Sequence, residues 1–345
     1  MSLRSEIHQQ PETLRALLDA GWADVERAAA AIRAREIDYI YLAARGTSEH
    51  AGIYGQYVLG AFNGLPVALA APSLFGVYHR PPRLGRALVV GVSQSGQSPD
   101  IVGVLDEANR QGALTLSITN DPGSPLAQAA AISLDIRAGS ERAVAATKTY
   151  SAQLLTFAML SVALAGDADR RADLGRLPAA VAAALQIEDD VARAAAGLRE
   201  MGHCVVLGRG YHFATALEWS LKLKELTYVV AERYSTAEFQ HGPIALVEPG
   251  FPVLAVAPRD AGADDTRALL ARLSGERGAT VLALSDDEAT LAAATVGLRL
   301  PGGLPAWLAP IISIAPAQLF CYHLALARGF DPDAPRGLSK VTRTQ

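Results

Sequence analysis

The chain alternates short apolar runs with longer amphipathic stretches. Five runs in its first half have the length and the aliphatic content of buried strands: 39–43, 67–70, 87–92, 113–118 and 132–136. Helices are predicted before and between them at 10–35, 48–62, 99–110 and 147–165. Short apolar strands that alternate with helices predict a parallel sheet covered on both faces, the doubly wound, flavodoxin-like α/β class.

The second half repeats this alternation. Its strands are predicted at 204–207, 253–257, 281–284 and 296–300, and its helices at 179–199, 211–231, 264–274 and 304–327. Residues 39–60 and 203–225 both consist of a strand, an Arg-Gly turn and a long helix. This internal similarity predicts a duplicated domain.

The polar segment Gly166–Pro178 is expected to link the two domains. We therefore expect three parts. Residues 1–170 hold an N-terminal helix and the first domain, residues 171–330 form the second domain, and residues 331–345 are a tail without apolar periodicity.

Composition narrows the class of protein. Half of the 345 residues are hydrophobic, which is enough for two cores. A net charge of −4 gives no basic surface for nucleic acid or an anionic membrane. Cys204 and Cys321 lie in apolar runs and predict buried, reduced thiols. The N-terminus lacks the apolar segment of a signal peptide, and the proline-containing stretch Leu304–Ala327 predicts a core helix rather than a membrane span. We expect a cytoplasmic protein without nucleic-acid or membrane partners.

The segment Val89–Asp100, VVGVSQSGQSPD, predicts an anion site. A buried strand ends in a polar turn, and Pro99 opens a helix whose free amides and dipole favour negative charge. The lysine of a P-loop is missing, so the turn suits a single phosphate monoester. The candidate ligands are Ser93, Gln94, Ser95 and Ser98. The alternative is an ordinary turn capped by Ser98.

A second glycine turn, ARGTS, follows the strand at 39–43. Ligands of open α/β sheets gather at this carboxyl edge, so Thr47 and Ser48 are candidates to bind the same ligand. The alternative is that one of them caps the next helix. Metal-ligand spacing and a dinucleotide motif are both missing, so we expect neither a metal nor another cofactor.

Three charged residues share one face of the helix predicted at 211–231: Glu218, Lys222 and Glu225. The alternative is a solvated stripe of ion pairs, but the rest of this helix is mostly apolar. A carboxylate beside an ammonium in a cavity can move a proton between adjacent carbons.

Two further residues could take part in such chemistry. His241, in EFQHGP, is expected to be presented from a loop as an acid–base group, although a lone histidine is often structural. Lys340 lies in the tail between Leu338 and Val341, which could anchor it. A partly buried lysine can form a Schiff base, whereas the alternative for the tail is a frayed terminus.

Six motifs occur in the same order as in a known family: ARGTS, SQSGQSPD, AGSERAVAATK, LKLKEL, EFQHGP and PRGLSKVT. From about residue 25 to 345 the chain resembles the isomerase half of glucosamine-6-phosphate synthase, which is built of two SIS (sugar isomerase) domains. The resemblance implies a hexose or hexosamine 6-phosphate as ligand and a homodimer.

The resemblance also implies roles for individual residues. Ser93, Gln94, Ser95 and Ser98 match the phosphate turn, with Thr47 nearby, and Val144 lies in the loop that holds the sugar. Glu225 matches the carboxylate that moves the proton between C1 and C2, with Lys222 beside it. His241 matches the ring-opening histidine that the neighbouring subunit supplies, and Lys340 matches the lysine that forms the Schiff base.

The departures from the family pattern concern the substrate. The synthase begins with a glutaminase domain, whereas this chain enters the SIS region almost directly from MSLRSE. Gln97 replaces an acid of the family turn, and Ala146 replaces a serine. We therefore expect a deaminase that converts glucosamine 6-phosphate to fructose 6-phosphate and ammonia. The alternatives are a fructosamine-6-phosphate deglycase and a non-catalytic regulatory module that binds a sugar phosphate.

Overall fold

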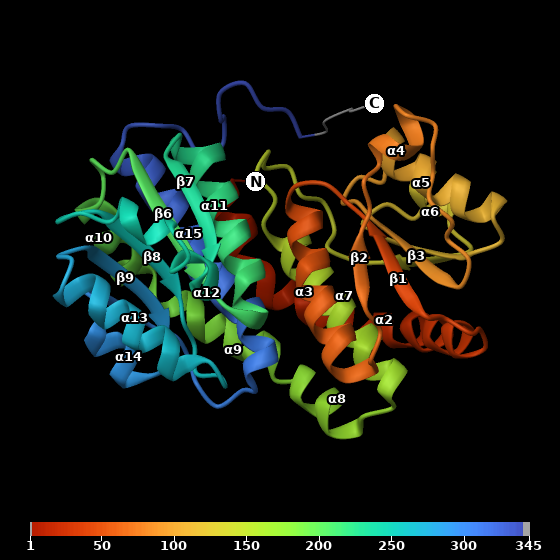
Figure 1. The fold of residues 1–345 in the computed structure, drawn as a ribbon, viewed down its shortest axis with the longest axis horizontal. Helices are drawn as coiled ribbons and strands as arrows, with labels where there is room; N and C mark the ends of the chain where they lie inside the picture. Colours follow the sequence, from red (N-terminus) through yellow and green to blue (C-terminus); the bar gives the residue numbers. More distant parts are fainter. Residues whose placement is uncertain (1, 341–345) are drawn as a thin grey trace. The chain divides into compact units, whose positions relative to one another are not determined.

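The computed structural model describes residues 2–340. These residues form two compact units (Figure 1). The first domain comprises Glu12–Glu141, Lys148–Gly175 and the tail residues Ser339 and Lys340. The second domain comprises residues 2–11, the loop Arg142–Thr147 and Arg176–Leu338. The division after Gly175 lies close to the boundary expected at residue 170, but the first helix and the loop at 142–147 belong with the second half of the chain.

The first domain contains a five-stranded parallel sheet in the order β2-β1-β3-β4-β5. Its strands are β1 (Tyr39–Ala43), β2 (Val67–Leu69), β3 (Ala87–Val92), β4 (Leu114–Thr119) and β5 (Ile132–Asp135). Its helices are most of α2 (Gln10–Arg33) and all of α3 (Thr47–Asn63), α4 (Ser73–Gly76), α5 (Pro99–Arg110), α6 (Pro125–Ala129), α7 (Lys148–Ala165) and α8 (Ala168–Leu174).

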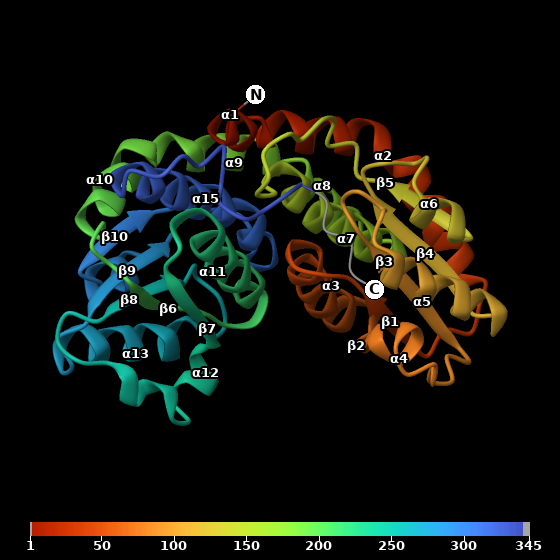
Figure 2. The same ribbon diagram turned by 90° about the horizontal axis from the view of Figure 1, so that it is seen from above.

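Helices cover both faces of this sheet. Ala87 and Val89 of β3 pack on one face against Ile101, Val104 and Leu105 of α5. Figure 2 shows α3 and α7 on the opposite face. These two helices approach closely at Gly55, where a Cβ would lie 2.7 Å from the ring of Phe157. The continuous apolar run of β3 follows from burial on both faces, as the sequence predicted.

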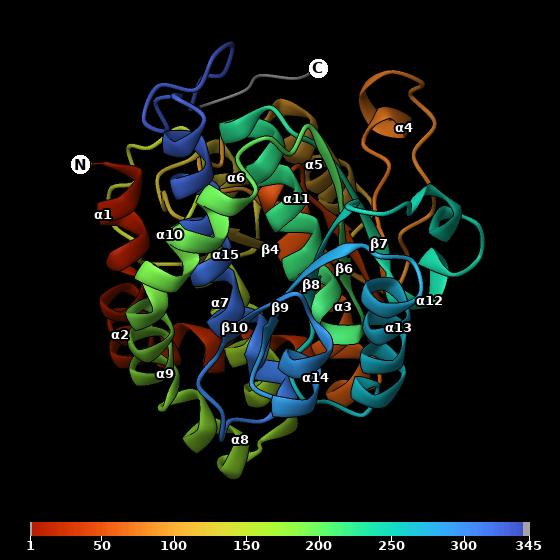
Figure 3. The same ribbon diagram turned by 90° about the vertical axis from the view of Figure 1, so that its left-hand side faces the viewer.

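The second domain repeats this architecture with the sheet order β10-β9-β8-β6-β7. Its strands are β6 (His203–Gly208), β7 (Val230–Ser235), β8 (Pro252–Val256), β9 (Thr280–Ser285) and β10 (Val296–Arg299). Its helices are α1 (Leu3–His8), α9 (Leu177–Ala184), α10 (Glu188–Gly197), α11 (Phe213–Thr227), α12 (Thr236–Phe239), α13 (Ala263–Gly275), α14 (Glu288–Ala293) and α15 (Ala309–Ala327). Figure 3 shows α13 and α14 in front of its sheet. The expected doubly wound α/β fold is thus confirmed in both domains.

Three expected elements differ from the structure. The helix predicted at 211–231 ends at Thr227, because Tyr228 adopts a left-handed φ of 58°, and β7 follows. The helix predicted at 179–199 is broken by a 3-10 turn at Leu185–Ile187. The expected linker contains α8, whose N-cap residue Asp167 accepts a hydrogen bond from the backbone N–H of Arg170.

Helix α15 is the core helix of the second domain. The stretch Ala306–Ala327 is long and apolar enough to cross a membrane, but 83% of its most apolar window is buried inside the protein. The ring of Phe320 meets Trp219 of α11 edge-on at 5.5 Å. Cys204 and Cys321 are buried free thiols, as expected, and burial raises the pKa of Cys204 to about 12.

Candidate functional site

The predicted phosphate turn connects β3 to α5 in the first domain. Its fold depends on Ser93, whose Oγ accepts a hydrogen bond from the Gly96 N–H at 3.1 Å. Gly96 has a φ of +62°, and a Cβ there would lie 2.1 Å from Oγ of Ser124. Only glycine fits at this position, so the backbone of the turn is tightly determined.

The hydroxyls of Ser95 and Ser98 lie at the end of this turn and differ from that of Ser93 in their hydrogen bonds. Ser98 is the N-cap residue of α5, but its side chain makes no capping hydrogen bond. The alternative that Ser98 merely caps the helix is therefore not what the structure shows. Ser95 Oγ accepts a hydrogen bond from the Gln97 N–H at 3.3 Å. Ser95, Gln94 and Ser98 are half-buried, next to the first amides of a 12-residue helix.

The turn after β1 lies beside the phosphate turn, because β1 and β3 are paired up to Ala43 and Gly91. Arg45 connects the two turns: its Nε donates to Oδ2 of Asp100 in α5 at 2.9 Å. The guanidinium of Arg45 is half-exposed, and Arg45 was not among the residues predicted for the site. The sequence signal that could have pointed to Arg45 is its place in the motif ARGTS, at the carboxyl end of β1.

Thr47 and Ser48 begin α3 after Gly46, whose φ is +52°. Ser48 is buried, and its Oγ accepts a hydrogen bond from Nε2 of Gln153 on α7 at 3.0 Å. Its oxygen therefore contributes to the packing of α3 on α7. Thr47 is half-buried at the very start of the helix.

The three charged residues of α11 form a cluster in the second domain. Nζ of Lys222 lies 3.4 Å from Oε1 of Glu218 and donates to Oε2 of Glu225. The side chains of Glu218 and Lys222 are 0% and 2% exposed, whereas that of Glu225 is 23% exposed. The alternative of a solvated ion-pair stripe is thus wrong. Glu225 is the carboxylate of this cluster that solvent reaches.

The charge balance of the cluster favours an ionised lysine. Burial alone would lower the pKa of Lys222, but the fields of Glu218 and Glu225 and their hydrogen bonds outweigh it and raise that pKa. A fixed positive charge therefore lies beside the carboxylate of Glu225.

His241 follows α12 and is exposed. Its backbone N–H donates to the carbonyl of Glu238 at 2.9 Å, and Gly242 has a φ of +133° before Pro243. The ring is therefore presented from a loop, as expected. It contributes to the wall of an open cavity of about 810 Å³ that Arg209, Gln240 and Arg272 also line.

Val144 lies in the loop Arg142–Thr147 and is half-buried. The carboxylate of Glu6 in α1 fixes this loop by accepting the backbone N–H groups of Arg142 and Ala143 at 2.6 and 3.1 Å. The role of Glu6 could not be predicted from the sequence, because its partners are about 136 residues away in the chain.

Lys340 contacts the first domain through one buried carboxylate. Its Nζ donates to Oε2 of Glu141 at 2.7 Å. The anchor expected from Leu338 is wrong, because that side chain is 45% exposed. Val341 lies outside the described residues. Glu141 was missed as well, although it stands in the motif AGSERAVAATK.

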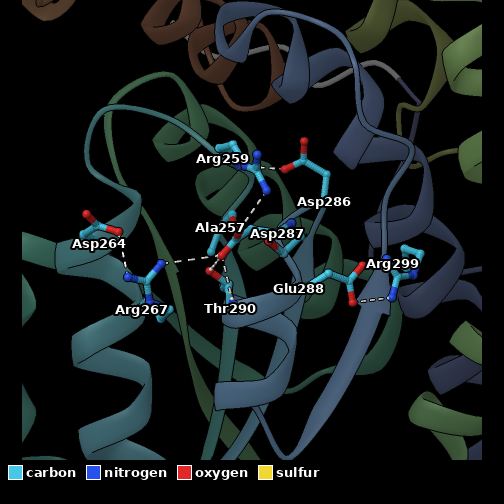
Figure 4. A network of polar contacts seen from close by, with 10 residues as sticks. Ala257, Arg259, Asp264, Arg267, Asp286, Asp287, Glu288, Thr290 and Arg299 are labelled. Carbon is cyan, nitrogen blue, oxygen red and sulfur yellow. Dashed lines mark hydrogen bonds and ion pairs between the residues drawn. The ribbon is translucent and has the colours of Figure 1, made fainter.

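The second domain carries a different turn at the position that corresponds to the phosphate turn (Figure 4). After β8, the backbone N–H of Arg259 donates to Oδ1 of Asp286 at 2.7 Å, and its guanidinium to Asp287 at 3.1 Å. Asp287 also accepts the N–H of Thr290 at 3.0 Å. These N–H donors at the sheet edge are therefore already bonded to carboxylates of the protein itself.

The candidate residues fall into two sets, one in each domain. The first domain brings together the phosphate turn and the start of α3, and it holds Lys340 on Glu141. The second domain brings together Lys222 and Glu225, and it carries Val144 and His241 on loops. Within residues 2–340 no group of His, Cys, Asp and Glu has the arrangement of a metal site.

Comparisons with known proteins agree with these motifs. The family model described as SIS domain matches residues 35–163 and 197–328. The glutamine–fructose-6-phosphate aminotransferase of Pyrococcus horikoshii is 35% identical over 97% of this chain, and that of Methanothermobacter thermautotrophicus is 36% identical over 99%. The matched regions cover 56% and 57% of these relatives, so the chain spans a little more than half of their length.

Solved structures extend the similarity to the fold. A Silicibacter pomeroyi protein assigned as a phosphosugar isomerase has a TM-score of 0.87 and 40% identity, and covers 96% of this chain and 100% of its own. The C-terminal domain of glucosamine-fructose-6-phosphate aminotransferase from Francisella tularensis has a TM-score of 0.88 and 29% identity, with 96% and 97% of the two chains covered. Both SIS segments and the expected resemblance are thus confirmed, and the chain belongs to the SIS domain family.

Proposed function

We propose that residues 1–345 convert glucosamine 6-phosphate and water to fructose 6-phosphate and ammonia. The observation that carries this proposal is the α11 cluster, in which a solvent-reached carboxylate, Glu225, touches a buried ammonium, Lys222. Such a pair suits proton transfer between adjacent carbons, because the carboxylate moves the proton and the ammonium stabilises the developing negative charge.

The phosphate turn supports the choice of a phosphorylated substrate. The phosphate accepts hydrogen bonds from Ser95, Ser98 and the first amides of α5. Its binding energy supports catalysis because it fixes the position of the reacting sugar. Thr47, Ser48, Ser93, Gln94 and Val144 complete the predicted binding residues.

The reaction then proceeds in three steps. His241 of the neighbouring subunit in a homodimer moves the proton that opens the pyranose ring. Glu225 takes the proton from C2 and returns it to C1, which turns the amino aldose into a ketimine. Lys340 attacks C2, ammonia leaves, and water hydrolyses the resulting Schiff base to fructose 6-phosphate and free lysine.

Every group that this reaction uses belongs to residues 1–345. The relatives from Pyrococcus and Methanothermobacter are named as isomerizing aminotransferases, so the same isomerase chemistry is used there. The reduced thiols and the phosphorylated substrate suit the cytoplasm.

Two incubations and one binding measurement with the purified protein test the proposal. Glucosamine 6-phosphate should yield equal amounts of ammonia and fructose 6-phosphate, and Glu225→Gln should abolish both. A fructosyl-amino acid 6-phosphate that releases free amino acid instead would identify a deglycase. Calorimetric binding of glucosamine 6-phosphate without turnover of either substrate would contradict both enzymatic functions and favour the regulatory module.

A further inference from the structure

Glu141 is a buried carboxylate at a place where the mechanism above uses none. It lies between β5 and α7, and its side chain is 0% exposed. Its oxygens accept the backbone N–H of Thr149 at 3.1 Å, the hydroxyl of Thr149 at 2.8 Å and the ammonium of Lys340 at 2.7 Å. A buried carboxylate with these donors has a fixed position and orientation.

Two of these donors do not depend on the tail. Thr149 is the second residue of the 18-residue helix α7, so its N–H group belongs to the free amides of the helix N-terminus. The dipole of α7 also favours a negative charge there. Glu141 is therefore held in place by the first domain itself, before Lys340 docks.

In contrast to the buried Glu141, Lys340 is partly exposed. It lies in an irregular segment, its side chain is 24% exposed, and the neighbouring Leu338 is exposed. Gly337 has a φ of 72°, which is typical of a turn. The contact that fixes the amine in the described part of the tail is thus the ion pair with a prearranged carboxylate.

We propose that Glu141 is a positioning residue that docks Lys340 on the first domain and serves as counter-ion during its Schiff-base step. The docking stands on geometry alone, whereas its catalytic consequence rests on the proposed function. An amine held at one place reacts much faster than one on a free chain end, since its orientation is already determined.

The charges of the step fit a docked ammonium. Lys340 gives one proton to the ketimine nitrogen, and its free pair then attacks C2. A second proton then passes from the lysine nitrogen to the old nitrogen, the bond from C2 to that nitrogen breaks, and ammonia leaves. A ketimine and an ammonium thus become an iminium and ammonia. The positive charge leaves the lysine nitrogen with the first proton and returns to it in the iminium, so Glu141 balances the charge of the lysine nitrogen at the start and at the end of the step.

Glu141→Gln tests the proposal in the full-length protein. The amide oxygen keeps an acceptor for Thr149, so the fold should survive, but the side chain carries no charge for an ammonium. Glu36→Gln is the matched control, because Glu36 is 85% exposed and pairs only at the surface with Arg86.

The first measurement is the rate of tryptic cleavage after Lys340, followed by mass spectrometry without substrate. Trypsin must take up the lysine side chain, so cleavage requires release from Glu141. We expect about ten-fold faster cleavage in Glu141→Gln, as the loss of a charge-assisted hydrogen bond implies, and no change in Glu36→Gln. An unchanged rate in Glu141→Gln would overturn the proposal. If that variant fails to fold, Glu141→Asp, one methylene shorter, should show an intermediate increase, and a wild-type rate there would equally overturn it.

The second measurement is borohydride trapping of Lys340 with fructose 6-phosphate. The adduct should form in the wild type and in Glu36→Gln, and about ten-fold more slowly in Glu141→Gln. Faster cleavage with undiminished trapping would refute the role in the Schiff-base step. If the wild type forms no adduct, the function proposed for Lys340 is wrong, and the cleavage rates still decide whether Glu141 docks it.

Discussion

Nζ of Lys222 lies 3.4 Å from Oε1 of Glu218, one helical turn earlier on α11, and solvent reaches neither group. Glu218 neutralises the ammonium within the core, so Lys222 can remain charged while its other carboxylate partner, Glu225, reaches solvent. The pair therefore links the stability of the second domain to the chemistry proposed for Glu225.

Replacing Glu218 should destabilise the protein strongly. Glu218→Gln leaves the charge of Lys222 buried with one carboxylate fewer, and breaking a buried pair costs about 3–5 kcal/mol. Urea unfolding should show this loss in the free energy of unfolding. Glu232→Gln, at an exposed position of β7, should change it by less than about 0.5 kcal/mol. Equal stability of the two variants would mean that Glu218 is not the counter-ion.

Glu225→Gln should keep substrate binding and lose turnover. The amide has nearly the same shape but accepts no proton, and general acid–base groups contribute about 10²–10⁴-fold to the rate. Steady-state kinetics with glucosamine 6-phosphate should show a lower kcat at a similar KM. A kcat close to the wild-type value would remove Glu225 from the mechanism.

The serines of the phosphate turn should separate into two classes. Ser95→Ala and Ser98→Ala each remove a donor to a dianion, worth roughly 1.5–3 kcal/mol, so KM should rise about ten-fold or more. Ser93→Ala should instead lower thermal stability, because its Oγ accepts the Gly96 N–H. Competition by inorganic phosphate supplies the check: its inhibition constant should rise in parallel for Ser95→Ala and Ser98→Ala, and a constant value would contradict a phosphate site.

Mixing two inactive variants should restore activity if His241 acts across subunits. A heterodimer of His241→Ala and Glu225→Gln chains holds one intact site and one site with both defects. Activity should therefore recover after subunit exchange, which mass spectrometry of the native dimer can verify. Verified exchange without recovery would place each site within a single chain.

Acid should destabilise the second domain through Glu188. Burial raises the pKa of Glu188, but hydrogen bonds from Arg4, His323 and His8 outweigh it and lower that pKa from 4.5 to about 2. A carboxyl with a lowered folded-state pKa stabilises the fold above its unfolded pKa, and this contribution is lost as the pH falls from about 4.5 towards 2. Urea unfolding should show a shallower decline in this range for Glu188→Gln than for the wild type. Glu200→Gln, with a side chain 91% exposed, should decline like the wild type.

Strand β3, which is buried on both faces, and the helix α5 that follows it were predicted best from the sequence. The bounds of β3 and α5 agree with the expectation, because a continuous apolar run and a proline at the helix start are local signals. The strand β7 was not predicted, because its local signals are misleading. It is an edge strand with exposed polar residues, and the helical spacing of α11 continues into it across Tyr228.

Long-range partners could not be predicted in this way. The motif around Glu141 was noticed, but its pairing with Lys340 joins residues 199 positions apart. The face of Glu218, Lys222 and Glu225 was predicted from spacing, whereas the burial of two of its members depends on the packing of α11.

The carboxylates after β9, which bond to the turn after β8, make the two domains unequal. Asp286 and Asp287 occupy amide and guanidinium donors at the edge where the first domain offers half-buried serine hydroxyls. A phosphate that approached the second edge would meet negative charge, so titration should saturate at one phosphosugar per chain. We therefore expect no phosphate to bind at the second sheet edge, while helix α11 of the same domain carries the proposed acid–base pair.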